Sequence, residues 1–139
     1  MTATLLDGKA VALSIRNELT TRVANVQERL GRAPALAIVL VGDDPASEVY
    51  VRNKLKTAQD AGMGVHLERL SGSSPLAAVL AVVDRFNKDS KYDGILVQSP
   101  LPKSLGAEAE QRVFDAIDPG KDVDGFSPIS DGRVLQNRA

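Results

Sequence analysis

The feature that most constrains the fold is an unbroken apolar run at residues 35–41, with the sequence ALAIVLV. A strand with one face in water alternates apolar and polar side chains, whereas a strand covered on both faces is apolar throughout. The run is short for a helix, and three of its seven residues are β-branched. We therefore predict a buried strand of a parallel sheet, with helices against both of its faces.

Segments with helical and extended patterns alternate along most of the chain. Asp7 is expected to cap the first helix, which carries an apolar stripe from Val11 to Leu30 and ends at Gly31. Alternation of this kind produces βαβ units with right-handed crossovers. The predicted fold is an α/β domain with three layers (helix, sheet, helix) and a mainly parallel sheet. Its further elements are expected to be helices at 46–61, 75–86 and 106–116 and strands at 65–70 and 95–97.

The regular pattern stops after Ile117. Residues 118–131 read as loop, and 118–139 as a whole are expected to be mostly loop. The chain reaches Ala139 without a terminating element, which is the pattern of an interrupted protein rather than a finished one. Its 139 residues suit one domain.

Composition excludes several classes of function. The net charge is −1, which gives no electrostatic case for binding nucleic acid or an anionic membrane. No apolar run approaches the roughly 20 residues of a membrane span, and the N-terminus has no secretory signal, so a cytoplasmic location is expected. Cysteine is absent, which excludes disulfides and thiol nucleophiles, and the single histidine, His66, is interpreted as a strand residue.

The acidic segment 118–125 invites a calcium interpretation, which fails on spacing. With Gly125 at the sixth position of a calcium loop, the first ligand position is Gly120 and the twelfth is Asp131 instead of glutamate. We therefore expect no metal site. No glycine-rich dinucleotide fingerprint follows any strand either, so no cofactor-binding residues are expected in this chain.

Ligands of open parallel sheets bind beyond the carboxyl ends of the strands. Two of these ends carry polar residues here: the helix 46–61 follows the first strand, and Gln98 follows the third. A helical wheel at about 100° per residue divides the helix into three stripes. Val51 and Leu55 face the sheet, Arg52 and Lys56 face solvent, and Ser47, Tyr50 and Lys54 lie on the shoulder between them.

Lys54 and Gln98 are the candidates for chemistry. Desolvation on the shoulder of the helix would lower the pKa of Lys54 and make it a proton donor and acceptor; alternatively, it is a snorkelling lysine beside a packed tyrosine. Gln98 can accept a hydrogen bond from an ammonium group and donate one to a substrate. Alternatively, it hydrogen-bonds to the rigid loop 100–102 that follows it.

Three segments, in order, resemble the bifunctional methylenetetrahydrofolate dehydrogenase/methenyltetrahydrofolate cyclohydrolase family. They are VGDDPASEVYVRNKLK at 41–56, GILVQSPLP at 94–102 and KDVDGF at 121–126. The resemblance extends over nearly the whole chain, from Leu6-Asp7-Gly8-Lys9 onward. It implies that residues 1–139 form the folate-binding catalytic domain, with a tetrahydrofolate site between this domain and a following NADP-binding Rossmann domain that the chain lacks.

The resemblance also implies roles for individual residues. Lys54 matches the catalytic lysine, and Tyr50 its neighbouring active-site tyrosine, which stacks on the aminobenzoyl ring of the folate; Tyr50 and Gln98 are counted with Lys54 among the catalytic residues. Ser47 would line the same wall, Gln98 would position and tune the lysine, and Asp124 would hydrogen-bond the pterin ring.

The implied reactions are NADP-dependent oxidation of 5,10-methylenetetrahydrofolate and hydrolysis of the methenyl product to 10-formyltetrahydrofolate, in an intact enzyme that is a homodimer. The alternatives are a folate-binding domain that is catalytically silent in isolation, and a structural domain that has lost its ligand. Two departures from the family pattern are Ser99, where leucine is common, and Asn137, where glycine is usual.

Overall fold

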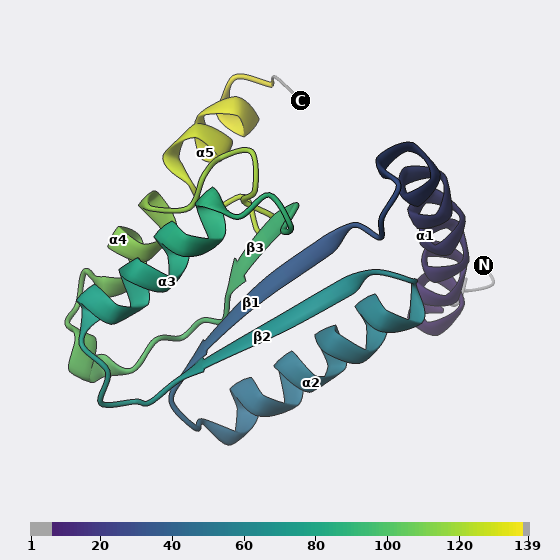
Figure 1. Ribbon diagram of the computed structural model, residues 1–139. Helices are drawn as coiled ribbons and strands as arrows, with labels where there is room; N and C mark the ends of the chain where they lie inside the picture. The colour runs from purple at the N-terminus through teal and green to yellow at the C-terminus, as the bar shows by residue number, and fades with distance from the viewer. Residues whose placement is uncertain (1–6, 138–139) are drawn as a thin grey trace, which may run out of the picture.

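A computed structural model describes residues 7–137, and its strands form one parallel sheet (Figure 1). The strand order is β2-β1-β3. The central strand pairs with β2 along its full length, from Ala35 opposite Gly64, and with β3 from Leu36 opposite Gly94. The strands are β1 (Ala35–Val41), β2 (Gly64–Leu70) and β3 (Gly94–Val97). The predicted parallel sheet is confirmed, and His66 lies in β2, as expected.

Helices cover both faces of the sheet, as the apolar run predicted (Figure 1). On one face, Ile38 and Leu40 of β1 pack with Val51 of α2 (Pro45–Asp60). On the other face, Val39 packs with Val83 of α3 and with α4. These two helices span Leu76–Lys88 and Ala109–Asp115. Residues 37–41 of β1 are all buried, so the three-layer α/β prediction is confirmed.

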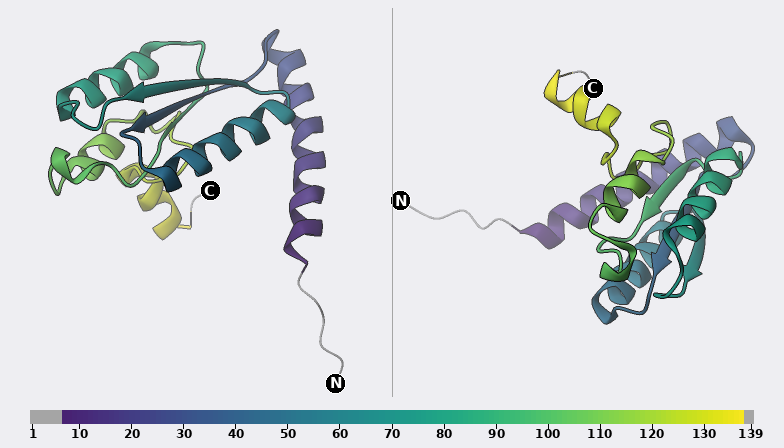
Figure 2. Two further views of the ribbon diagram at one scale, coloured as in Figure 1. Left: turned by 90° about the horizontal axis from the view of Figure 1, so that it is seen from below. Right: turned by 90° about the vertical axis from the view of Figure 1, so that its left-hand side faces the viewer.

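The first helix, α1 (Gly8–Leu30), has the predicted ends but little contact with the body of the domain. Asp7 accepts hydrogen bonds from the first turn, and Gly31 closes the helix with φ 68°. Of the apolar stripe, only Val23 is buried, and Val11, for example, is 58% exposed. Figure 2 shows the helix projecting from the domain, so its apolar stripe stays largely uncovered. In the described chain, no helix is both long and apolar enough to cross a membrane.

The C-terminal region differs from the prediction at two points. The expected helix 106–116 is shorter: a 3-10 turn at Lys103–Leu105 ends at Gly106 with φ 98°, residues 107–108 form a turn, and α4 begins only at Ala109. A further helix, α5 (Pro128–Leu135), begins within residues 118–131, which were expected to be loop. Ser127 accepts a hydrogen bond from the amide of Ser130, and Pro128 occupies the first turn, so the helix has a favourable start. Leu6 and Ala139 lie outside the described residues.

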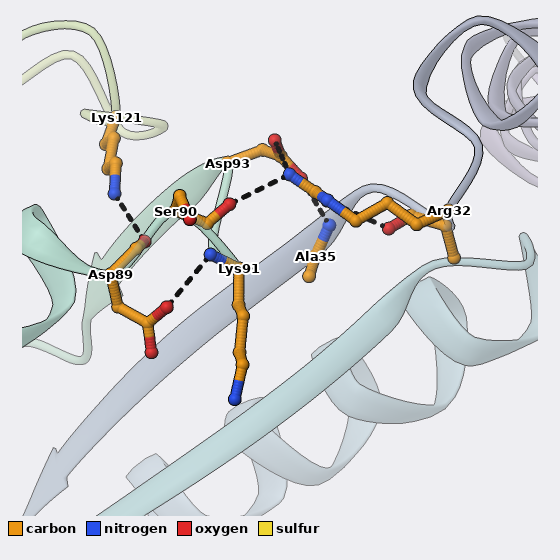
Figure 3. A network of polar contacts seen from close by, with 8 residues as sticks. Arg32, Ala35, Asp89, Ser90, Lys91, Asp93 and Lys121 are labelled. Atoms are coloured by element: carbon orange, nitrogen blue, oxygen red, sulfur yellow. Dashed lines mark hydrogen bonds and ion pairs between the residues drawn. The ribbon is translucent and has the colours of Figure 1, made fainter.

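An ion pair and several hydrogen bonds connect the segments that flank the start of β3 (Figure 3). Arg32 donates two hydrogen bonds, of 2.7 and 2.8 Å, to the carboxylate of Asp93. This carboxylate also accepts from the backbone amide of Ala35 at 2.8 Å. The hydrogen bond from Arg32 is the main reason why the pKa of Asp93 is lowered. The α1–β1 connection is thereby joined to the α3–β3 connection.

Lys121 anchors the loop that follows α4. Its amino group donates to the carbonyls of Phe86 and Asp89 at the end of α3, at 2.9 and 2.8 Å. The carbonyl of Lys121 accepts from the amide of Ile95 at 2.7 Å, and Asp122 forms an isolated parallel bridge with Ile95. The loop therefore runs along the outer edge of β3, in the direction of that strand.

Candidate active site

A cavity of about 680 Å³ lies between α1, α2 and the loop beside β3. Tyr50 and Lys54 line it from α2, and Val123 and Asp124 line it from the loop. Its floor includes Leu36 of β1 and Leu96 of β3, and its far wall consists of residues of α1. Three of the predicted site residues, Tyr50, Lys54 and Asp124, therefore share one cavity.

The orientation of α2 explains why Lys54 reaches this cavity. Asp44 caps the helix by accepting from the amide of Ser47 at 2.8 Å. Val51 is fully buried against the sheet, and this fixes the rotation of the helix about its axis. Lys54 is consequently half-buried, whereas Lys56 is exposed. The predicted phasing of the helix is confirmed.

Gln98 holds the amino group of Lys54. The Nζ atom of Lys54 donates to Oε1 of Gln98 at 3.2 Å. The Nε2 atom of Gln98 donates to the carbonyl of Ser99 at 2.6 Å. Gln98 is only 8% exposed, so both ends of its amide are used where water has little access. The sequence left two contacts of Gln98 open, one with the ammonium group of Lys54 and one with the loop that follows Gln98. The structure contains both.

Asp124 faces the same space from the opposite side. Asp124 as a whole residue is exposed, but its carboxyl group is partly buried. This burial raises the pKa of Asp124 above the ordinary aspartate value; the charge of Lys54 opposes the increase, and the charge of Asp122 adds to it. A carboxyl in this situation favours ligand groups that donate hydrogen bonds, because they replace the water it has lost.

Asp122 shapes the loop that presents Asp124. It accepts from the amides of Gly125 and Ser127, each at 2.9 Å, and from the hydroxyl of Ser130 at 3.0 Å. Burial alone would raise the pKa of Asp122, but these hydrogen bonds outweigh it and lower the pKa. Asp122 is therefore a structural carboxylate, whereas Asp124 is free to meet a ligand.

The other predicted residues lie around the cavity. Tyr50 is 62% exposed and stands at the rim with its ring available for stacking. Ser47 is 4% exposed and lies one turn earlier on α2. The described residues that line the cavity do not include Ser47 or Gln98. Gln98 is connected to the cavity by its hydrogen bond with Lys54.

Some residues of the cavity were missed at the level of sequence. Thr57, Ala58 and Ala61 extend the stripe of Tyr50 and Lys54 at spacings of three and four, so continuing the helical wheel would have found them. Arg16 and Thr20 of α1 also line the cavity. No sequence signal predicts them, because the angle at which α1 meets α2 is a tertiary feature.

The arrangement suits a partly aromatic ligand with polar groups at one end. Apolar side chains line most of the cavity, an exposed aromatic ring stands at its rim, and an amine and a carboxyl converge within it. A half-buried amine held by an amide can also transfer protons to and from a bound ligand. No group of three or more potential metal ligands is found among residues 7–137.

Comparison with known sequences is consistent with this geometry. Residues 6–124 match the family model described as tetrahydrofolate dehydrogenase/cyclohydrolase, catalytic domain. The chain is 48% identical over 134 residues to the bifunctional protein FolD of Rhodopseudomonas palustris (strain HaA2), covering 96% of the chain and 44% of that protein. For the bifunctional protein FolD of Halalkalibacterium halodurans, identity is 48% over 135 residues, covering 97% and 47%. The chain thus spans about half the length of the curated relatives it matches.

Solved structures show the same relationship. The 5,10-methylenetetrahydrofolate dehydrogenase of the silkworm, Bombyx mori, superposes with a TM-score of 0.91 at 40% identity, over 98% of this chain and 46% of that one. The methylenetetrahydrofolate dehydrogenase-cyclohydrolase (FolD) of Trypanosoma brucei, solved with NADP cofactor and inhibitor, superposes with a TM-score of 0.90 at 32% identity. That match covers 100% of this chain and 47% of the other.

Proposed function

The chain belongs to the tetrahydrofolate dehydrogenase/cyclohydrolase family, and on this premise we propose that it is the folate-binding catalytic half of a bifunctional enzyme. The whole enzyme oxidises 5,10-methylenetetrahydrofolate to the 5,10-methenyl compound, with hydride passing to NADP. It then adds water to that product to form 10-formyltetrahydrofolate. The observation that carries the proposal is the amine of Lys54, held by Gln98 in a cavity that Tyr50 and Asp124 also line.

Lys54 is assigned the proton transfers of the hydrolysis. Water that attacks the methenyl carbon loses a proton, and the bond from this carbon to one ring nitrogen then breaks, so that nitrogen gains a proton. The proton of the hydroxyl left on the carbon departs to bulk water as the formyl carbonyl forms, which balances the positive charge of the methenyl substrate. A single amine beside the one-carbon unit can serve both transfers. Gln98 supports this role by holding Nζ at 3.2 Å.

The remaining residues are assigned to binding. Tyr50 offers its exposed ring to the aminobenzoyl group, and Ser47, buried one turn earlier, supports the same wall. Asp124 accepts hydrogen bonds from the pterin ring, for which the raised pKa of its carboxyl is supporting evidence. Hydride transfer requires chiefly that the one-carbon unit be held in position, and these contacts supply that.

The described residues do not fit the nicotinamide cofactor. The turn after β1 places Asp43 and Asp44 at the start of α2, where carboxylates would repel a pyrophosphate. β3 is followed by Gln98 and a proline-rich loop, and β2 by a turn with a single glycine, Gly72. We assign the NADP site to a part of the whole enzyme outside this chain.

A second candidate is a folate-binding domain that is silent on its own. The exposure of Tyr50 favours it, because in the described structure nothing covers the outer face of this ring. A ligand stacked there would be held from one side only, and its one-carbon unit would be positioned less firmly.

For the whole enzyme, we further propose a homodimer in the cytoplasm, following the family resemblance. Light scattering of the whole enzyme after size-exclusion chromatography tests the dimer, and fractionation of the cells tests the location.

Two measurements on the purified chain test the proposed function. Calorimetric titration with 5-formyltetrahydrofolate, a stable folate, reports binding, and the decay of the methenyl absorbance reports hydrolysis. Binding with turnover supports the catalytic assignment, and binding without turnover supports the silent domain. Absence of folate binding would contradict both.

A further inference from the structure

The loop that carries Gln98 is held by a residue for which the reaction has no assigned use. We propose that Glu110 of α4 is a positioning residue for the amine of Lys54, acting through Ser99 and Gln98. This inference rests on the proposed function of Lys54, and it assigns to that site a residue that never touches the substrate cavity.

Glu110 holds the loop at two points with one oxygen. Its Oε1 atom accepts from the hydroxyl of Ser99 and from the backbone amide of Leu101, each at 2.7 Å. A charged acceptor makes such hydrogen bonds shorter and stronger than neutral ones. The backbone on both sides of Pro100 is therefore fixed relative to α4.

This fixed backbone determines which way the Gln98 amide points. An amide has a donor end and an acceptor end, so the partner at one end decides what the other end presents. The carbonyl of Ser99 receives Nε2 of Gln98 at 2.6 Å, and this leaves Oε1 toward Nζ of Lys54 at 3.2 Å. If the Ser99 backbone could rotate, Gln98 could turn its NH₂ group toward the lysine and repel its charge.

The surroundings make Glu110 a firm support. Its neighbour Ala109 is 3% exposed and Val113 is fully buried, so α4 is packed into the core beside β3. Glu110 itself is half-buried, and Leu101 is 8% exposed. A site whose supporting residues stand on packed elements keeps its geometry better than one supported by loops alone.

Three substitutions and a control test the proposal by cyclohydrolase kinetics. Glu110→Ala should lower kcat about tenfold and leave KM within about twofold, because displacement of the reacting group affects turnover more than binding. Glu110→Gln should stay close to the unmodified chain, because its amide oxygen can accept both hydrogen bonds. Ser99→Ala, which keeps the Leu101 contact, should be intermediate. Glu108→Ala is the matched control, since Glu108 is the exposed N-cap residue just before α4 and its side chain makes no capping hydrogen bond.

A second readout does not depend on activity. In NMR spectra, the side-chain amide signals of Gln98 should shift and exchange faster with solvent in the Glu110→Ala and Ser99→Ala variants. They should stay unchanged in Glu110→Gln and Glu108→Ala. If Glu110→Ala fails to fold, Ser99→Ala gives the same information with one anchor of the loop intact.

The possible results separate this inference from the proposed function. A chain that neither binds folate nor turns it over would contradict the proposed function, while the Gln98 signals would still decide the positioning role. Unchanged Gln98 signals in Glu110→Ala would overturn that role, as would kinetics equal to those of Glu108→Ala. A tenfold rise in KM without a change in kcat would also overturn it, since it would indicate a contribution to binding only.

Discussion

Lys54 and Lys56 lie two residues apart on α2 and yet have different surroundings. The amine of Lys54 is half-buried and donates to Gln98. The amine of Lys56 is exposed and pairs with Asp60, one turn later, at 2.7 Å. Exposed pairs at this spacing contribute little to stability. The two lysines therefore form a matched pair of which only Lys54 is assigned a part in the proposed chemistry.

Lys54→Met should reduce cyclohydrolase turnover at least about 100-fold, the lower range for loss of a positioned acid–base group. Lys56→Met should leave turnover within about twofold. Single-turnover decay of the methenyl absorbance measures both variants, in the chain if it is active by itself and otherwise in the whole enzyme. Equal losses in the two variants would show that neither amine has the role assigned to Lys54.

Asp124 should combine a benefit for binding with a cost for stability. Removal of its carboxyl in Asp124→Ala should weaken folate binding by about 1.5–3 kcal/mol, the contribution of a charge-assisted hydrogen bond. Burial raises the pKa of Asp124 in the folded state, so the ionised carboxylate destabilises the fold. The contribution of Asp124 to the free energy of unfolding is therefore greatest below the ordinary aspartate pKa, and it is lost as the pH rises through the raised pKa of the folded state.

Asp124→Asn should accordingly raise the thermal unfolding midpoint at neutral pH, and the gain should vanish in acid. Asp43→Asn, at an exposed position, is the control. A lower midpoint at neutral pH in Asp124→Asn would contradict the destabilising role of the ionised carboxyl.

Single residues differed in how far the sequence revealed them. The orientation of Lys54 followed from the helical period, because Val51 and Leu55 leave α2 one way to pack. The interaction of Gln98 with Lys54 was one of two open interpretations. Glu110 had no signal, since its partners are a hydroxyl and a backbone amide on a loop whose path no periodicity describes.

At the scale of elements, the approach of the 121–124 loop to β3 depends on Gly94. A Cβ atom at this position would lie 2.5 Å from Cγ1 of Val123 and 3.4 Å from Cδ1 of Leu36. Gly94→Ala should therefore push Val123 away and lower the free energy of unfolding by about 1–3 kcal/mol, the usual cost of overpacking. Folate affinity should fall as well, because the displaced loop carries Asp124.

Val123→Ala removes the atom that clashes and should restore most of the stability in the double variant. Urea denaturation and folate titration of the single and double variants measure the two effects. If Val123→Ala gives no relief in the presence of Gly94→Ala, the contact between the loop and β3 is not the cause.

Elements with a buried face were predicted well. The strand at 35–41 was found with the expected ends, and α2 differs by one residue at each end. α5 was missed because it has no buried side chain and hence no apolar period; only Ser127 and Pro128 mark its start. The start of α4 was placed too early because Gly106 has a positive φ of 98° and residues 107–108 form a turn before the helix begins.

For the molecule as a whole, the chain should show no dehydrogenase activity and no saturable affinity for NADP. The turns after its three strands offer two carboxylates, a single glycine or a proline-rich loop, and none of these suits a pyrophosphate. Calorimetric titration of the chain with NADP, carried to ligand concentrations as high as those that saturate the chain with folate, tests this expectation. Saturable micromolar binding would contradict it and would place a nucleotide site among the residues assigned here to folate.

The three-layer architecture was predictable because alternating strands and helices leave few topologies open. The placement of α1 was not. Its apolar stripe predicted a helix correctly, but a stripe does not identify what packs against it. In the described structure, five large apolar residues of this helix are exposed, namely Val11, Leu13, Ile15, Leu19 and Leu30.

The central position of β1 has a consequence for the newborn chain. Of the described strands, β1 is synthesised first; its two neighbours follow later, and β3 is complete only at Val97. Until then an uncharged segment of seven apolar residues lacks at least one of its two sheet partners. Such segments associate readily with copies of themselves, so this strand is open to self-association until both of its partners are in place.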